Sequence, residues 1–200
     1  LTSLGIEKLY THQAEAIDSI RRGENVVVVT STASGKTLCY NIPVIESLMS
    51  NPSCKSLYIF PTKALAQDQL KNLNTITSGI FGEGVVAHTY DGDTPQHRRK
   101  RVRMSSSILL TNPDMLHYSI LPNHIKWAHF FGNLKYIVID EIHIYKGVFG
   151  SNTAQVIRRL NRIANYYGST PQYICCSATI SNPIELAEKL TCQKMKLINN

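Results

Sequence analysis

The stretch Val26-Val-Val-Val-Thr30-Ser-Thr-Ala-Ser34-Gly35-Lys36-Thr37 decides the fold of this chain. The run of valines predicts a buried β-strand, the small residues after it predict a tight turn, and Gly-Lys-Thr begins a predicted helix. A turn of small residues that leads into a helix N-terminus can surround an anion with backbone N–H groups, and the helix end adds partial positive charge. The stretch therefore predicts a phosphate-binding loop.

The residues of this loop have separate expected roles. The backbone around the phosphates of a nucleotide is expected to come from four small residues, Thr32, Ala33, Ser34 and Gly35. Lys36 is expected to reach the β- and γ-phosphates, and the Thr37 hydroxyl to ligate Mg²⁺. Thr30 stands where such loops usually have their first glycine, which leaves nucleotide affinity an open question. The simpler alternative is a turn that only begins a helix.

A second stretch, Ile137-Val-Ile-Asp140-Glu141, brings two carboxylates to the end of an apolar strand. Crowding two acids at a buried strand end is costly unless a cation or a function compensates. We expect Asp140 to hold Mg²⁺, mostly through water, and Glu141 to orient and deprotonate the attacking water. The alternative is an acidic strand end that caps the following turn.

Strands and helices are predicted to alternate along the whole chain. The expected strands are residues 25–30, 55–60, 85–89, 107–111, 134–140, 171–176 and 194–198. The expected helices are residues 11–22, 36–50, 62–76, 94–104 and 152–167, with a further helix capped by Asn182. Several strands are apolar throughout, as in a sheet covered on both faces. This pattern predicts one doubly wound α/β domain with a mainly parallel sheet of about seven strands, whose ligands bind beyond the carboxyl ends of the strands.

Composition narrows the class of protein. The 200 residues carry a formal charge of +7, which suits a polyanionic partner, and 43% of them are hydrophobic, which excludes disorder for most of the chain. Five cysteines without metal-binding spacing predict free thiols in a reducing, intracellular compartment, or in the nucleus of a eukaryote. No apolar run is long enough for a membrane span, and no signal peptide is visible. Because the chain opens on Leu1, we expect it to be part of a longer protein.

The order of motifs resembles the first RecA-like domain of a superfamily 2 helicase of the DExH type. The matching segments, in chain order, are Leu9-Tyr-Thr-His-Gln13, Thr30 to Thr37, Pro61-Thr-Lys-Ala-Leu65, Asp91-Gly-Asp-Thr94, Thr111-Asn-Pro-Asp114, Asp140-Glu-Ile-His143 and Ser177-Ala-Thr179. The residues around and after Asp140 also resemble a narrower group, the Hrq-type RecQ-related DNA helicases of fungi and their bacterial relatives in mitomycin repair. That resemblance implies 3′-to-5′ translocation on single-stranded DNA and a role in DNA repair.

The resemblance also assigns residues outside the two stretches above. Gln13 is expected to read adenine, since a glutamine amide can pair with N6 and N7, and this favours ATP over GTP. His143 is expected at the nucleotide, and Ser177 and Thr179 are expected to couple it to the nucleic acid. Six residues are expected to touch the sugar-phosphate backbone without reading sequence, namely Thr62, Lys63, Gly92, Thr94, Thr111 and Asn112. For several of these, ordinary turns and helix caps remain alternatives.

We therefore expect residues 1–200 to be the ATP-binding half of a DNA helicase motor, with ATP and Mg²⁺ as cofactors and single-stranded nucleic acid as partner. The family implies a second RecA-like domain, for which no space remains after Thr179, and that domain supplies an arginine finger. The isolated fragment is therefore expected to be nearly inactive. An RNA helicase, a duplex translocase and an ATP-dependent switch without motor action remain alternatives; a GTPase or kinase would leave Gln13 without a role.

Two further features favour structural interpretations. The basic run at residues 97–103 invites a nucleic-acid reading, but a solvated helix face explains it better. Trp127, Phe130 and Phe131 have the aromatic rings that could stack on a base, but packing over the sheet edge is the better explanation.

Overall fold

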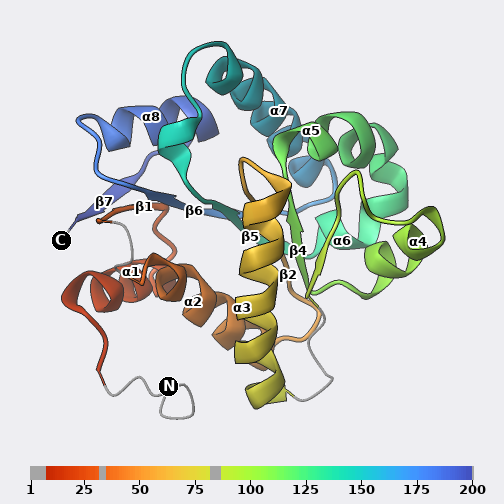
Figure 1. Cartoon of the computed structure of the whole chain (residues 1–200), viewed down its shortest axis with the longest axis horizontal. Coiled ribbons are helices and arrows are strands. Elements are labelled where there is room, and N and C mark those ends of the chain that lie inside the picture. Colours follow the sequence, from red (N-terminus) through yellow and green to blue (C-terminus); the bar gives the residue numbers. More distant parts are fainter. Residues whose placement is uncertain (1–7, 32–34, 82–86, 200) are drawn as a thin grey trace.

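The computed structural model describes residues 8–31, 35–81 and 87–199, and Figure 1 shows a central sheet between two layers of helices. Within these residues the sheet has seven strands in the order β3-β4-β2-β5-β6-β1-β7, and every neighbouring pair is parallel. The strands are β1 (Val26–Val29), β2 (Lys55–Ile59), β3 (Ala87–Thr89), β4 (Ile108–Thr111), β5 (Leu134–Ile139), β6 (Gln172–Ser177) and β7 (Lys196–Asn199). The predicted doubly wound parallel sheet is confirmed.

Alternation along each strand divides the core into two halves. Val26 and Val28 pack with α1 (Thr11–Arg21), α2 (Lys36–Ser50) and α3 (Lys63–Phe81) on one face of the sheet. Val27 and Val29 belong to the core of the opposite face, with α7 (Gly147–Tyr166) and α8 (Pro183–Thr191). Because successive side chains of a strand point to opposite faces, a run of valines serves both halves at once.

The second face is completed by short elements between β4 and β5. These are α5 (Pro113–Met115), the π-helix η2 (Leu116–Ile120), the 3₁₀ helix η3 (Leu121–Trp127) and α6 (Ala128–Gly132). Trp127, Phe130 and Phe131 are at most 2% exposed in this core, which confirms that they pack rather than face solvent. The basic helix α4 (Gln96–Ser105) buries only Val102, so most of the basic run is a solvated face, as predicted.

Several boundaries differ from the prediction. Helix α7 begins at Gly147 rather than at residue 152, and its Gly150 lies so close to the Tyr145 backbone that a Cβ could not be accommodated. Helix α1 ends at Arg21, one residue earlier than predicted. The Asn182 side chain does not cap α8, since its amide donates to the Glu185 carboxylate at 3.1 Å instead.

Four of the five cysteines are buried and Cys192 is exposed, and all five are free. In the described part of the chain, none of the helices combines the length and the apolar character that crossing a bilayer requires.

Because all strands are parallel, their carboxyl ends share one edge of the sheet. Thr30 and Asp140 follow β1 and β5, and Ser177 is the last residue of β6, which lies between those two strands in the sheet. The segments after β2, β4 and β3 lie on the other side of β5 along the same edge. Strand order therefore separates the predicted nucleotide residues from the predicted nucleic-acid residues while keeping both at one edge.

Candidate active site and nucleic-acid face

The predicted phosphate loop begins where β1 ends and finishes at the first turn of α2. Gly35 precedes α2 with a φ of +71°, a conformation that L side chains rarely adopt. Lys36 Nζ lies 3.3 Å from the Thr30 carbonyl oxygen and 3.4 Å from that of Ser31, so the ammonium group is held against the turn. The partly exposed Thr37 follows in the same helical turn. Three members of the predicted loop, Thr32, Ala33 and Ser34, lie outside the described residues.

Gln13 connects α1 to this loop. Its side chain is 2% exposed, its Oε1 accepts a hydrogen bond of 3.0 Å from the Tyr10 backbone N–H, and its Nε2 donates one of 3.1 Å to the Gly35 carbonyl. The amide therefore orients the last residue of the loop. Recognition of adenine by Gln13 remains a prediction.

Asp140 follows β5 as a nearly buried carboxylate, 6% exposed. Its Oδ1 accepts a hydrogen bond of 2.8 Å from the Glu141 backbone N–H, and its Oδ2 accepts one of 3.2 Å from the Tyr40 hydroxyl. Burial raises the pKa of Asp140 to about 6, and the neighbouring charge of Glu141 contributes in the same direction, while both hydrogen bonds and Lys36 oppose the shift. The ionised carboxylate thus lacks sufficient positive charge around it.

Glu141 and His143 join this strand end to the segment after β6. Glu141 has a φ of +53°, and its Oε2 lies 3.2 Å from His143 Nδ1. The same Nδ1 lies 3.3 Å from the Ala178 backbone nitrogen, which donates toward it. A protonated Nδ1 can donate to Glu141, whereas only an unprotonated Nδ1 can accept from Ala178, so the imidazole serves one neighbour at a time.

Ser177 and Thr179 flank Ala178 but differ in exposure. Ser177 is fully buried and its hydroxyl donates to the Ala178 carbonyl at 2.7 Å, whereas Thr179 is exposed. Thr179 lines a cleft with Thr30 and Ser31, so this segment lies beside the phosphate loop. The contact with His143 is made by the backbone of Ala178 rather than by the two hydroxyls that the sequence singled out.

The segments after β2 and β3 bring further predicted nucleic-acid residues to the same sheet edge. Lys63 is the first residue of α3 and is exposed. Thr62 caps this helix by accepting the Leu65 backbone N–H at 3.3 Å. Lys63 Nζ forms an ion pair of 2.8 Å with Asp93, from the loop after β3. Gly92 in that loop is exposed, and a Cβ there would meet nothing within 4 Å, so a backbone contact has open access.

Three other predicted nucleic-acid residues are engaged within the chain. The Thr94 hydroxyl accepts the Asp91 backbone N–H at 3.0 Å and shapes the loop. Thr111 is 1% exposed and its hydroxyl donates to the Tyr90 carbonyl at 2.7 Å. Asn112 caps α5 by accepting the Met115 backbone N–H at 2.9 Å. These side chains position loops, and their contact with nucleic acid remains a prediction.

A sequence model of the DEAD/DEAH box helicase family matches residues 10–187. The chain belongs to the DEAD/DEAH box helicase family. It is 55% identical over its whole length to the uncharacterized ATP-dependent helicase YprA of Bacillus subtilis, of which it covers 27%. It is 50% identical over 182 residues to the ATP-dependent helicase HRQ1 of Saccharomyces cerevisiae, which amounts to 90% of this chain and 17% of that protein. The helicase domain thus spans between 17% and 27% of the length of these relatives.

Among solved structures, the DUF1998 helicase MrfA bound to DNA superposes on the whole helicase domain with a TM-score of 0.97 and 55% identity. The domain covers 28% of that chain. A structure of MrfA bound to DNA and AMPPNP gives a TM-score of 0.96. These likenesses confirm the expected RecA-like fold and the expected kinship with Hrq-type helicases.

The donors at the strand end of this helicase domain fit Mg²⁺. Burial first and the neighbouring Glu141 charge second raise the pKa of Asp140, and a bound cation would stabilise the ionised carboxylate against both effects. Carboxylate and hydroxyl oxygens are the ligands that Mg²⁺ takes in proteins, and Asp140 and Thr37 would supply them.

Some contacts at this site carried no signal in the sequence of the helicase domain. Tyr40 donates a hydrogen bond to Asp140, 100 residues away in the chain. It lies inside α2, where an aromatic residue predicts only packing in the core. Asp93 lies within a recognised motif, but its pairing with Lys63 depends on two strand ends that are brought together by the fold. No local pattern could have revealed either contact.

Proposed function

We propose that this domain is the ATP-binding half of an ATP-dependent 3′-to-5′ DNA helicase that couples ATP hydrolysis to translocation on single-stranded DNA. One observation carries the proposal. Lys36, Asp140 and Glu141 follow or adjoin strands at the same sheet edge that presents Lys63 and Gly92. A nucleotide site and a strand-binding face at one edge can communicate through the strand ends between them.

The chain's own residues have distinct tasks in the proposed hydrolysis. Lys36 neutralises charge on the terminal phosphates. Asp140 and Thr37 would hold Mg²⁺, which would supply Lewis-acid polarisation of a phosphate oxygen. Glu141 accepts the proton of the attacking water. Glu141 has a left-handed backbone conformation that turns the chain sharply after the strand, so its side chain need not point in the same direction as that of Asp140. Gln13 holds the loop end and is proposed to select adenine.

Coupling is proposed to run through His143. Its Nδ1 faces both Glu141 and the Ala178 backbone, so a change at the catalytic acid alters which partner the imidazole binds. Ser177 and Thr179 would move with that backbone. This exchange of hydrogen-bond partners would link the nucleotide site to the segment after β6 without any direct contact between ATP and DNA.

Binding of single-stranded DNA is proposed to use Lys63 and the exposed backbone at Gly92. The neighbouring residues Thr62, Thr94, Thr111 and Asn112 are proposed to contribute to the same DNA-binding face. Contacts of this kind bind phosphates and ignore sequence, which a translocating motor requires. DNA is favoured as the substrate because MrfA, 55% identical to this chain, has been crystallised with DNA. A role in intracellular DNA repair is proposed on the same kinship.

A second RecA-like domain in the longer protein is proposed to close over the nucleotide and supply an arginine finger, which raises the rate by ~10³-fold or more. In this domain Lys36 lowers the pKa of Asp140, but its effect is smaller than the opposing effects of burial and of Glu141. We therefore expect the 200-residue domain alone to turn ATP over slowly and not to unwind DNA.

The test is ATP hydrolysis and strand displacement by the full-length protein, with matched DNA and RNA oligonucleotides. The proposal predicts stimulation by single-stranded DNA, displacement only of duplexes with a 3′ overhang, and loss of both in Glu141→Gln. Preferential stimulation by RNA would point to an RNA helicase, and stimulation by duplex alone to a translocase. ATP binding without any directional movement would replace the motor by a switch.

A further inference from the structure

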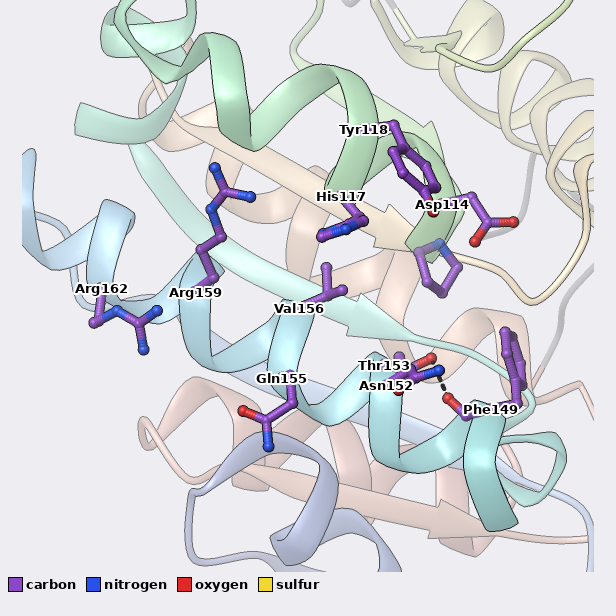
Figure 2. Close-up of a pocket in the computed structure, with 11 residues that line it drawn as sticks. Asp114, His117, Tyr118, Phe149, Asn152, Thr153, Gln155, Val156, Arg159 and Arg162 are labelled. Atoms are coloured by element: carbon purple, nitrogen blue, oxygen red, sulfur yellow. Dashed lines mark hydrogen bonds between the residues drawn. The ribbon is translucent and has the colours of Figure 1, made fainter.

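A groove of about 520 Å³ lies between the elements that follow Asn112 and helix α7. Figure 2 shows its two walls. Asp114, His117 and Tyr118 of α5 and η2 form one wall, and Phe149, Arg159 and Arg162 of α7 belong to the other. None of these six residues has a part in the nucleotide site described above. The volume is within the range of clefts that hold ligands.

Two aromatic rings in the groove are presented to solvent. Tyr118 is 76% exposed and its ring meets only His117 among the described aromatic rings, edge to face at 4.6 Å. Phe149 is 40% exposed although it stacks on the buried Tyr145 at 5.4 Å. Large aromatic side chains that remain exposed beside one cleft mark a surface for binding.

The charge of the groove is positive. Within the described residues, neither Arg159 nor Arg162 has a carboxylate partner, although this chain pairs Arg21, Arg22 and several lysines with acids. Asp114 is the one acidic residue among the described residues that line the groove. Two unpaired guanidinium groups next to exposed aromatic rings match the phosphates and bases of a single strand.

The groove also continues the proposed strand-binding face. Helix α5 begins at Pro113, directly after Asn112, so one wall starts where the predicted backbone contacts end. We propose that single-stranded nucleic acid leaving Asn112 enters this groove, stacks bases on Tyr118 and Phe149 and sets phosphates against Arg159 and Arg162. The inference rests on the proposed function and extends its binding site onto α7. Stacking on aromatic rings does not depend on base identity, so the groove lengthens the grip without adding sequence preference.

The test uses the full-length protein and fluorescent oligodeoxythymidylates of graded length at several salt concentrations. For long oligonucleotides we expect Tyr118→Ala to weaken binding roughly tenfold. Arg159→Gln and Arg162→Gln should each reduce the slope of log affinity against log salt by about 0.7. Short oligonucleotides, which end before the groove, should bind all variants equally.

Helix α7 also provides matched control residues that lie outside the groove. Tyr166 is 77% exposed on α7, and Arg158 faces Cys192 at 3.2 Å, so Tyr166→Ala and Arg158→Gln remove the same groups outside the groove. Neither control should change binding at any length. A photo-cross-linking side chain in place of Tyr118 should attach to DNA and not to another segment of the protein.

Two results would overturn the inference in distinguishable ways. If Lys63→Ala weakens binding while Tyr118→Ala and the two arginine variants do not, or if the cross-link joins protein to protein, the groove does not hold nucleic acid but the proposed function stands. If the unaltered protein binds no single-stranded DNA, both proposals fall.

Discussion

The side chain of Gln13 and the backbone of Gly35 are in direct contact, because Gln13 Nε2 donates a 3.1 Å hydrogen bond to the Gly35 carbonyl. A Cβ added at Gly35 would lie 2.6 Å from the same nitrogen, and the φ of +71° already disfavours any side chain. The positive φ favours glycine at the end of the phosphate loop, and a side chain there would also force the Gln13 amide to move.

Gly35→Ala should destabilise the domain by about 2–3 kcal/mol, of which ~1 kcal/mol comes from the left-handed backbone and the rest from the clash. Nucleotide affinity should fall with it, because the loop end must move. Urea unfolding and titration with a fluorescent ATP analogue measure both effects. Gly23→Ala is the matched control, since Gly23 has a φ of +84° and open space around it. Equal losses at the two positions would argue against the contact.

Adding Gln13→Ala to Gly35→Ala should restore part of the lost stability, because the shorter side chain removes the clash but not the backbone strain. A double-mutant cycle therefore gives a coupling energy of about 1 kcal/mol or more. Strict additivity of the two changes would contradict the contact seen here.

Asp140→Asn should stabilise the nucleotide-free domain at neutral pH while abolishing hydrolysis. The folded-state pKa of Asp140, about 6, lies above its ordinary value near 3.8, so the folded protein binds this proton more tightly than the unfolded chain. Stability associated with the proton is present below the ordinary value and is lost as pH rises through about 6. The neutral asparagine escapes that loss, which amounts to up to about 3 kcal/mol.

The measurement is the difference in Tm between Asp140→Asn and the unaltered domain from pH 4 to pH 8, with a chelator present. The difference should be small near pH 4 and grow until pH is well above 6. The exposed Asp114→Asn serves as the control and should show little change. A difference that is constant with pH, or that shrinks as pH rises, would be inconsistent with the raised pKa.

Asp93→Asn should strengthen binding of single-stranded DNA two- to fivefold at low salt, because it frees Lys63 from its 2.8 Å ion pair for a phosphate. The pair is exposed and contributes only about 0–1 kcal/mol to stability, so Tm should hardly move. Fluorescence anisotropy at several salt concentrations measures the effect. Asp68→Asn, which breaks an exposed pair with Lys71 on the same helix, is the control. An unchanged or weaker affinity in Asp93→Asn would show that Lys63 does not meet the strand.

His143→Ala should uncouple ATP hydrolysis from DNA more than it weakens ATP binding. The imidazole is the one side chain that contacts both Glu141 and the Ala178 backbone among the described residues. Loss of such a link is expected to lower DNA stimulation of the ATPase roughly 2- to 30-fold. The exposed His129→Ala provides a matched control. Normal stimulation in His143→Ala would place the coupling elsewhere.

Much of the local structure could be predicted from the sequence. The valines of β1 and the bounds of α2 were predicted correctly, because strand propensity and a Gly-Lys-Thr start are signals contained in a few neighbouring residues. Helix α7 was predicted five residues too short, since its first turn contains Gly147 and Gly150, which locally favour a turn. Gly150 instead lies inside the helix, so close to the nearby Tyr145 backbone that a Cβ could not be accommodated.

The amino-acid sequence by itself determined the elements, their alternation and the identity of Lys36, Asp140 and Glu141, because each depends on periodicity or on spacing within one short segment. The tertiary structure alone decided the strand order, the bonds of Tyr40 to Asp140 and of Gln13 to Gly35, and the groove between η2 and α7. These contacts join residues far apart in the chain. Such pairings depend on how strands are arranged beside one another in the sheet, which no local pattern encodes.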